Sequence, residues 1–416
     1  MKTDTQNRVI HFSLEAMHPL RENFKTRSEH TDDPFTDTGD QPEDPDSLYS
    51  EFEAHPGAAD TPPGDPELAA QLIRVFGDDS QNCLTLLPGN LYFFGSEVRG
   101  VIPYTLAGKR TMSLGDPVCR PADREALLRE YLSFCKSNSY KAVFNSVSEE
   151  LSELLGSMGF CVLKYGEEAI LDLNTYTLAG GKKGSLRRNA AKLDRAGIFI
   201  EEYRPEQNRD LLLEEEISKV EAQWFAGKKL KLTYSVGDLQ FEKPRGRRYF
   251  VTRDPDGHLL TVLSFLPYKH ESGYCVDVMY RMPDGPTGAM EHAIISAAMK
   301  MKAEGAEEVS LNIAPLAGID VTKPDTNRAE KLMHEIFCHM DFGYDFKNLY
   351  RFKSKFDPSV WKPRYLVYDR RIPLAGLATS IANTKGAADI SLYRQYKRFF
   401  LSLFLFPRRY REPQDE

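Results

Sequence analysis

The segment YFVTRDPDGHLLTVLSFLPYKHESGYCVDVMY, residues 249–280, decides the fold. It holds three runs rich in β-branched and aromatic residues, at 249–252, 259–266 and 274–280, and the turn Asp254-Pro255-Asp256-Gly257 separates the first two. Runs of this kind, bounded by Asp, Pro and Gly, predict strands joined by tight turns. The segment therefore predicts an antiparallel meander.

A helix and further strands follow the meander. Apolar residues at helical spacing predict a helix over 288–304. Beyond it we expect a strand at 309–313, a helix around 327–340, and strands at 348–352 and 364–368.

The preceding part of the chain has the same order of elements. We expect strands at 90–94, 100–104, 110–114, 142–147 and within 160–173, with helices at 121–136 and 148–158. No repeat of individual residues accompanies this repeat of elements. The sequence therefore predicts an α/β fold with mixed sheets, in two tandem domains of similar architecture.

Composition divides the 416 residues into five parts. We expect a disordered acidic segment at 1–66, a first domain at 67–180, a basic linker helix at 181–205, a second, catalytic domain at 206–370, and a basic, aromatic tail at 371–416. The net charge of -7 excludes a uniformly basic nucleic-acid binder, although local basic surfaces remain.

Targeting signals and metal motifs are absent from the sequence. The apolar run 399–406 is shorter than the roughly 20 residues that cross a bilayer, and residues 1–20 do not form a signal peptide, so we expect a cytoplasmic protein. Six cysteines lack a C-x-x-C pair, and His334 and His339 are not spaced as ligands on one helical face. We therefore predict no metal site.

Several strings resemble those of a known family. They are LGDPV (114–118), KYGEEA (164–169), LRR (186–188), VDVM (276–279), APL (314–316), FKNLYRFKSKFDP (346–358) and WKPRYL (361–366). In this order they resemble the cytosolic C-terminal domain of bacterial phosphatidylglycerol lysyltransferases, the multiple peptide resistance factors, and of their alanyl-transferring relatives.

The resemblance implies two GNAT-like acyltransferase domains joined by a basic helix. It also implies an aminoacyl-tRNA as donor, no separate cofactor, an anionic phospholipid as acceptor, and a place at the inner face of the cell membrane. Lysine and alanine are the amino acids that it suggests. The family's flippase portion has no counterpart in these strings, so lipid flipping is not expected.

Asp277 is the sharpest candidate, because it lies in a mostly apolar strand. Strand alternation puts it on the face of Cys275 and Met279, and a buried carboxylate needs a partner. The resemblance implies that Asp277 helps to bind the aminoacyl group; a structural salt bridge to an arginine is the alternative. The family usually has arginine three residues later, where this chain has Tyr280 followed by Arg281, and we include both as substrate-binding candidates.

The transfer chemistry depends mainly on positioning and on stabilising the tetrahedral oxyanion, because an aminoacyl-tRNA ester is already activated. Alternation in a strand at 348–352 would put Arg351 and Lys353 on one face. We therefore take Lys353 and Arg364, with Asp277, as catalytic candidates. The remaining substrate-binding candidates are Glu168, Asn312, Arg351 and Lys355. Solvated charges on a strand edge are the alternative.

Basic residues cluster in two further places. Lys182, Lys183, Arg187, Arg188, Lys192 and Arg195 are candidates for contact with tRNA phosphates or lipid headgroups. In the tail, residues 393–411 place cations on both sides of an aromatic, apolar stretch, which favours a helix lying on the membrane surface. A solvated helix face and a helix packed on the protein or on a second subunit are the respective alternatives, and the oligomeric state stays open.

Two other classes of function compete. One is a GNAT enzyme that uses acyl-CoA, or that transfers an aminoacyl group to a peptide or peptidoglycan precursor. The loop 281–288 weighs against acyl-CoA, because Pro283 and Pro286 remove backbone donors where a pyrophosphate would bind. The other is a lipid- or RNA-binding protein without catalysis.

Overall fold

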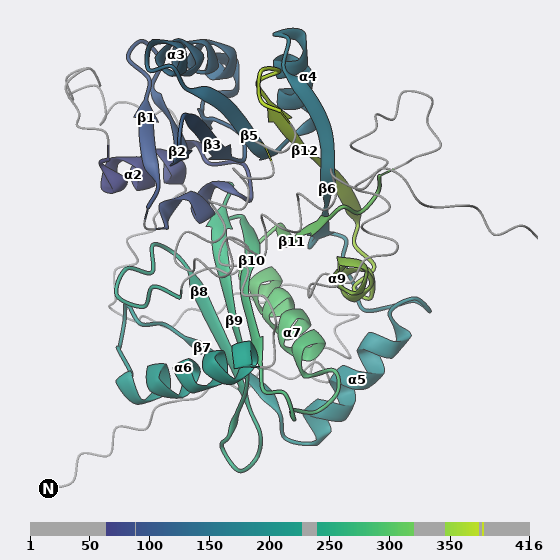
Figure 1. Ribbon diagram of the computed structural model, residues 1–416. Helices are drawn as coiled ribbons and strands as arrows, with labels where there is room; N and C mark the ends of the chain where they lie inside the picture. Colours follow the sequence, from purple (N-terminus) through teal and green to yellow (C-terminus); the bar gives the residue numbers. More distant parts are fainter. Residues whose placement is uncertain (1–63, 88, 227–238, 320–345, 374–376, 378–416) are drawn as a thin grey trace, which may run out of the picture.

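The computed structural model describes residues 64–87, 89–226, 239–319, 346–373 and 377 (Figure 1). Most of residues 1–66, the helix expected at 327–340 and the tail segment 393–411 lie outside these ranges. The described helices are α2 (Pro66–Phe76), η4 (Asn82–Leu86), η5 (Pro121–Asp123), α3 (Arg124–Ser137), α4 (Glu149–Ser157), α5 (Gly184–Arg195), α6 (Leu211–Ala226), α7 (Ala289–Ala303) and α9 (Phe346–Ser354).

The described strands belong to one continuous sheet, in the order β1-β2-β3-β5-β12-β6-β11-β10-β9-β8-β7, with β4 paired to β2. They are β1 (Leu91–Phe94), β2 (Gly100–Ala107), β3 (Arg110–Leu114), β4 (Val118–Cys119), β5 (Lys141–Val147), β6 (Cys161–Asp172), β7 (Phe199–Tyr203), β8 (Arg248–Arg253), β9 (Leu259–Tyr268), β10 (Gly273–Arg281), β11 (Glu308–Pro315) and β12 (Val360–Tyr368).

One structural unit occurs twice in this sheet. In the first half β1, β2 and β3 form an antiparallel meander, and β5 returns parallel to β3 after α3. In the second half β8, β9 and β10 form the meander, and β11 returns parallel to β10 after α7. The predicted mixed α/β fold and its duplicated architecture are confirmed.

The two halves exchange their last strands. β6 comes from the first half of the chain but pairs with β11, whereas β12, at the end of the described chain, pairs with β5. The two exchanged strands also pair with each other and so join the halves. The predicted limits 67–180 and 206–370 do not anticipate this exchange, because strand pairing over long sequence separations leaves no local pattern. Likewise β7, inside the expected linker 181–205, is an edge strand on β8.

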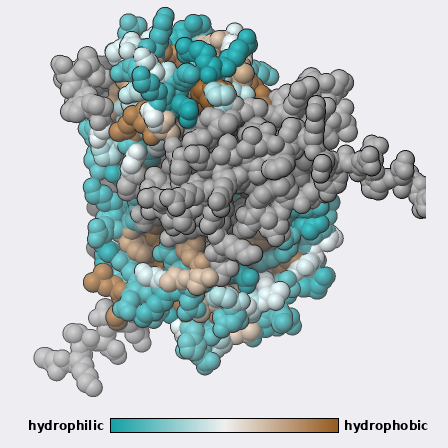
Figure 2. All heavy atoms as spheres, viewed as in Figure 1, coloured by the Kyte–Doolittle hydropathy of each residue, from teal (hydrophilic) through white to brown (hydrophobic). Residues whose placement is uncertain are grey.

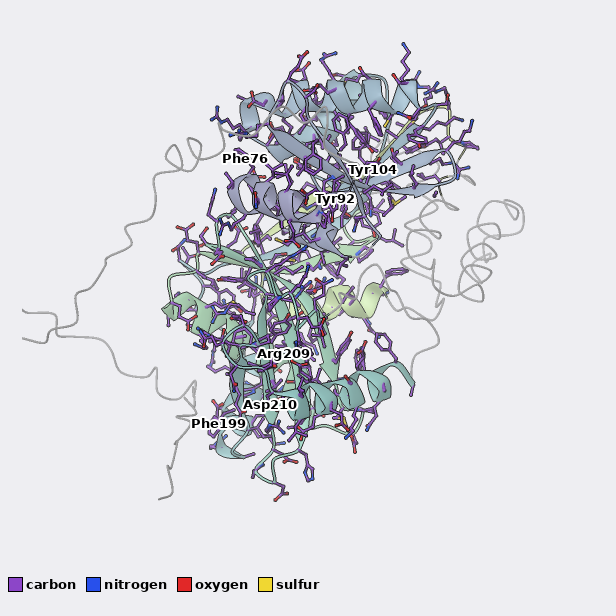
Figure 3. The ribbon with its side chains drawn as sticks, turned by 90° about the vertical axis from the view of Figure 1, so that its left-hand side faces the viewer. Phe76, Tyr92, Tyr104, Phe199, Arg209 and Asp210 are labelled. Carbon is purple, nitrogen blue, oxygen red and sulfur yellow. The ribbon has the colours of Figure 1, made fainter. Side chains whose placement is uncertain are left out.

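Helices cover both faces of the sheet. In the first half α3 and α4 pack on one face through Leu127, Leu128, Tyr131, Leu151 and Leu155. In the second half α7 covers one face and α6 the other. Figure 3 places Phe76, Tyr92 and Tyr104 in the first half, with Phe199, Arg209 and Asp210 in the second.

Helix α2 begins where the acidic segment ends. Asp65 caps it, because its carboxylate accepts hydrogen bonds from the backbone N–H groups of Glu67 (3.0 Å) and Leu68 (3.1 Å), and proline follows at the first helical position. The buried face of α2 packs in a cluster that includes Leu114 of the first half and Leu266 of the second. This helix therefore bridges the two halves.

The strand predicted at 348–352 is wrong: these residues lie in α9. The misleading signal was the alternation of Arg351, Phe352 and Lys353, which spans too few residues to separate a strand from a helix. On a helix, two residues two positions apart point to different sides. Arg351 is accordingly exposed, whereas Lys353 is buried.

The described surface seen in Figure 2 is largely hydrophilic. Within the described ranges, no helix has the length and apolar character needed to cross a membrane.

Candidate active site

A buried cluster of polar side chains, which we call the polar hub, lies where the exchanged strands meet. Glu168 of β6 is fully buried, and its Oε2 accepts hydrogen bonds from Nε (2.8 Å) and Nη2 (2.5 Å) of Arg364 on β12. Arg364 also binds Asp79 through Nη1 at 2.6 Å. Two carboxylates therefore hold one guanidinium between the halves.

Hydroxyl groups complete the polar hub. Ser80 donates to Glu168 Oε1 at 2.5 Å, and Ser310 of β11 donates to the same oxygen. Burial works to raise the pKa of Glu168, but Arg364 and the two serines outweigh it and hold that pKa below its usual value. At Asp79, by contrast, burial outweighs Arg364 and raises the pKa. We assign the charge of the pair firmly to Glu168, because it accepts more hydrogen bonds.

Irregular strands produce the space for this cluster. The register shifts between Ser310 and Ile313 on β11 and between Arg364 and Tyr365 on β12. Asn312 has a φ of 65°, in the left-handed region that asparagine tolerates better than most residues. Bulges turn side chains out of the ordinary alternation, and they are common beside active sites.

Strands β10 and β11 separate at this point. Their parallel pairing ends at Cys275 and Ser310. Beyond it, Asn312 donates from Nδ2 to the carbonyl oxygen of Val276 at 3.1 Å and so bridges the widening gap. The open ends of parallel strands are a usual place for ligands, which favours Asn312 as a site residue.

Asp277 lies beside a second register shift, between Val276 and Met279 on β10. Its Oδ2 is 3.5 Å from Nη2 of Arg247 and 3.5 Å from Oγ of Ser264, and both charged side chains are buried. The predicted common face with Met279 is wrong, because the bulge turns Met279 toward the cluster of Val276. An arginine partner, the predicted alternative, is present.

Lys353 is the most perturbed cation of the site. Its Nζ donates to the carbonyl oxygen of Ile313 at 2.6 Å, and 2% of the residue is exposed. Burial lowers the pKa of Lys353 to about 7, against the weaker opposing influence of Cys275 and Glu168. An amine with this pKa gains or loses a proton near neutrality, which suits acid–base work.

Tyr280 and Arg281 point to the side of α6. Tyr280 is buried, stacks edge-on against Phe225 and donates from its hydroxyl to Glu221 at 3.2 Å. Arg281 lies over the ring of Trp224 at 5.9 Å. Both therefore contact the second half's outer helix, and no described contact joins them to Glu168 or Arg364.

Arg351 and Lys355 lie outside the polar hub. Arg351 is exposed and approaches Asn348 at 3.5 Å, and Lys355 forms an ion pair of 2.7 Å with Glu291. Their place on the surface suits contact with a large ligand. The polar hub itself is completed by the other candidates.

The basic helix α5 is present as predicted. Leu186, Ala190 and Leu193 are buried, whereas Arg187, Arg188, Lys192 and Arg195 are exposed. Before the helix, Lys182 and Lys183 face Asp357 at 3.4 and 3.8 Å, and Lys183 lies over the ring of Tyr176. This places the loop before α5 beside the segment that follows α9.

Helix α5 also crosses the start of α7. Gly288, with a φ of 89°, caps α7, and a Cβ at this position would lie 3.2 Å from Asn189 of α5. A pyrophosphate at this N-terminus would compete with α5 for space. The structure therefore adds a steric argument against acyl-CoA to that of Pro283 and Pro286.

Several site residues were not predicted. Asp79, Ser80 and Ser310 of the polar hub, Arg247 beside Asp277, and Glu221 beside Tyr280 carry no motif of their own. Two acid-rich signals were available, Asp78-Asp79-Ser80 directly after α2 and the lone serine in strand 309–313. Neither indicates a partner without the fold.

The described residues also bring Asp254, Asp256 and His258 together in the turn between β8 and β9, with ligand atoms within 4.8 Å of one another. The group is largely exposed, and Asp254 accepts a hydrogen bond of 2.8 Å from the backbone of His258. An exposed turn of this kind is explained by its own hydrogen bonds. The absence of a metal site stays a prediction.

Comparison with known proteins agrees with this site. Residues 70–368 match the family model of the phosphatidylglycerol lysyltransferase C-terminal region. The chain belongs to this family. Phosphatidylglycerol lysyltransferases of Bacillus subtilis and of Staphylococcus epidermidis are each 26% identical to it, over 311 and 310 residues that cover 75% and 74% of this chain. The chain spans 36% of the length of these two relatives.

Solved structures support the same fold. The structure of L-PGS from Bacillus licheniformis is 25% identical and has a TM-score of 0.66, covering 77% of this chain and 95% of that one. A C-terminal domain of a putative lysylphosphatidylglycerol synthetase from Agrobacterium fabrum is 24% identical with a TM-score of 0.61, covering 73% and 91%. The latter likeness concerns the fold alone.

Proposed function

We propose that this protein transfers an aminoacyl group from a charged tRNA to a hydroxyl group of an anionic phospholipid such as phosphatidylglycerol. The observation that carries the proposal is the match of residues 70–368, nearly the whole described chain, with the lysyltransferase family. Aminoacyltransferase activity is the activity for which its relatives are named.

In the proposed reaction the lipid hydroxyl attacks the ester carbonyl of the aminoacyl-tRNA. A new carbon–oxygen bond forms, the bond to the ribose oxygen breaks, and the proton of the lipid hydroxyl ends on the ribose oxygen. Lys353, with a pKa of about 7, suits the proton transfer. The polar hub of Glu168 and Arg364 holds strands β6 and β12 in register around the reacting groups.

The remaining candidates fit the two large substrates. The exposed cations Arg188, Lys192 and Arg195 of α5 offer contacts for phosphates, as do Lys182, Arg187 and Arg351 nearby. We also propose a peripheral position at the inner face of the membrane, to which residues 393–411 contribute through their sequence. No cofactor enters the scheme, since the aminoacyl-tRNA is itself the activated donor.

The test is to incubate the purified protein with total charged tRNA and phosphatidylglycerol vesicles, and to identify new lipids by mass spectrometry. We expect an aminoacyl ester of phosphatidylglycerol that disappears when the tRNA is deacylated beforehand. Parallel reactions with acyl-CoA, and with a peptidoglycan precursor as acceptor, test the competing functions. Product from either of these, with none on the lipid, would overturn the proposal.

A further inference from the structure

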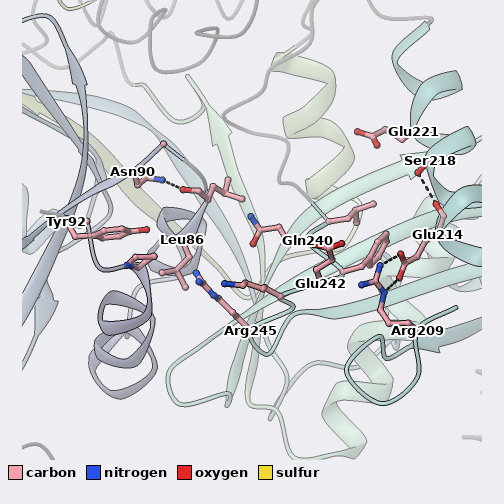
Figure 4. A pocket seen from close by; sticks show the side chains of 17 residues that line it. Leu86, Asn90, Tyr92, Arg209, Glu214, Ser218, Glu221, Gln240, Glu242 and Arg245 are labelled. Atoms are coloured by element: carbon pink, nitrogen blue, oxygen red, sulfur yellow. Dashed lines mark hydrogen bonds and ion pairs between the residues drawn. The ribbon is translucent and has the colours of Figure 1, made fainter. Parts of the chain in front are cut away.

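A cavity of about 670 Å³ lies between the two halves on the side of the sheet that α6 covers (Figure 4). The first half lines it with Leu86, Asn90 and Tyr92 around η4 and β1. The second half lines it with Glu221 of α6, Gln240 and Phe241. Its volume suits a ligand of the size of an amino acid ester.

The cavity adjoins the candidate active site. Leu239 lines it, and the carbonyl oxygen of Leu239 accepts a hydrogen bond from the hydroxyl of Tyr249 on β8. Glu221 lines it as well and is bound by Tyr280, which follows Asp277 on the same strand. The strands that carry Asp277 therefore form part of the cavity's surroundings.

The cations of the cavity wall are already neutralised by protein carboxylates. Arg209 forms two hydrogen bonds, of 2.7 and 2.6 Å, with the carboxylate of Glu214. Lys243 and Arg245 approach Glu67 at 3.3 and 2.8 Å. The wall therefore offers little unpaired positive charge to an anion.

Glu221 differs from the other carboxylates of the wall that are half-buried. Among the described residues its contact is the hydroxyl of Tyr280, a neutral donor, and no ion pair reaches it. Arg281, which follows Tyr280, lies over Trp224 instead. Figure 4 shows the carboxylate of Glu221 directed from α6 into the cavity.

A half-buried carboxylate in a cavity is stabilised by a cation, and the bond to an ammonium group is stronger and more specific than one to a neutral donor. We infer that Glu221, held in place by Tyr280, binds the side-chain ammonium of a cationic aminoacyl group and selects it against an uncharged one of equal length. This inference rests on the proposed function and names the chemical class of its donor.

Binding of soluble ester mimics tests this selection without the transfer reaction. The probes are lysine methyl ester and 2-aminoheptanoic acid methyl ester, in which a methyl group replaces the ammonium. We expect calorimetry on the full chain to show the lysine ester binding about tenfold more tightly. Glu221→Gln, which keeps an oxygen for Tyr280, should abolish this preference.

Two further variants control the result. Glu215→Gln removes an exposed carboxylate from the same helix, paired with Lys219 at 2.9 Å, and should leave the preference unchanged. Glu221→Asp keeps the charge and should retain part of the preference. Equal binding of both esters to the wild type, no binding of either, or an undiminished preference in Glu221→Gln would overturn the inference.

The transfer assay separates this inference from the proposed function. Aminoacyl lipid formed equally from lysyl- and alanyl-tRNA, with no ester preference, would reject selection by Glu221 and leave the function standing. A clear ester preference without any lipid product would reject the lipid acceptor and leave the cationic site standing.

Discussion

Arg364 and Asp79, 285 positions apart in the sequence, form an ion pair of 2.6 Å in which both side chains are almost fully buried. The same guanidinium binds Glu168, so one side chain joins the turn after α2 to both exchanged strands. The stability of the junction between the halves therefore depends on a charge that no local pattern identifies as structural.

Replacement of that charge should be costly. We expect Arg364→Met to lower the free energy of unfolding by about 3–5 kcal/mol, because it leaves two carboxylates buried without their partner. Urea denaturation measures the change. Arg371→Met, which breaks an exposed pair with Asp369, is the matched control and should have little effect. Equal losses in both variants would contradict a special role of the polar hub.

Lys353 should make stability depend on pH. Its folded pKa of about 7 lies below the usual value near 10.5, so between these values the unfolded chain binds a proton that the folded chain does not. Stability should therefore rise with pH across this window, by at most about 1.4 kcal/mol per pH unit from this group. Denaturation at pH 7, 8 and 9 should show a smaller slope in Lys353→Met. An unchanged slope would mean that Lys353 is charged in the folded protein.

Asp277→Asn should separate catalysis from structure. The amide keeps the shape of the side chain and a contact to Ser264 but leaves Arg247 without a counter-ion, so some loss of stability is expected. We expect transfer to fall by about a hundredfold, since it depends on the position of the bound aminoacyl group. The measurement is turnover well below the melting temperature of the variant. Normal turnover with a lowered melting temperature would assign Asp277 a structural role.

Reversal of charge at Arg188, Lys192 and Arg195 should weaken tRNA binding. Each lost phosphate contact lowers the slope of log affinity against log salt by about 0.9 on duplex nucleic acid. Filter binding of tRNA over a range of salt concentrations measures both affinity and slope. Arg129→Glu, on the exposed side of α3, serves as the control. If the triple variant keeps the slope of the wild type, α5 is a solvated surface.

The sequence predicts the elements of this fold better than their arrangement. Apolar periodicity places α7 and the meander of β8, β9 and β10 correctly, because these features are local. It fails at α9, where three alternating residues outweighed a helix. The position of β12 between β5 and β6 has no local signal, since pairing across more than 200 residues is a property of the whole chain.

The site shows the same division. Asp277, Lys353 and Arg364 are found from polar residues in apolar or motif-like surroundings, and all three are buried. Their partners Arg247, Ile313, Asp79 and Glu168 come from four other places in the chain, and only Glu168 belongs to a resembling string. Bulges at Asn312 and at Val276–Met279 decide which side chains meet, and a bulge is not visible as periodicity.

The exchange of β6 and β12 has a consequence for synthesis on the ribosome. The early part of the chain emerges with β5 lacking its neighbour, and that neighbour is translated about 220 residues later, at Val360–Tyr368. At typical elongation rates of about 5–20 residues per second, the nascent chain carries an open sheet edge for about 10 to 40 seconds. The molecule is thus committed to folding largely after release, as a single unit whose halves mature together.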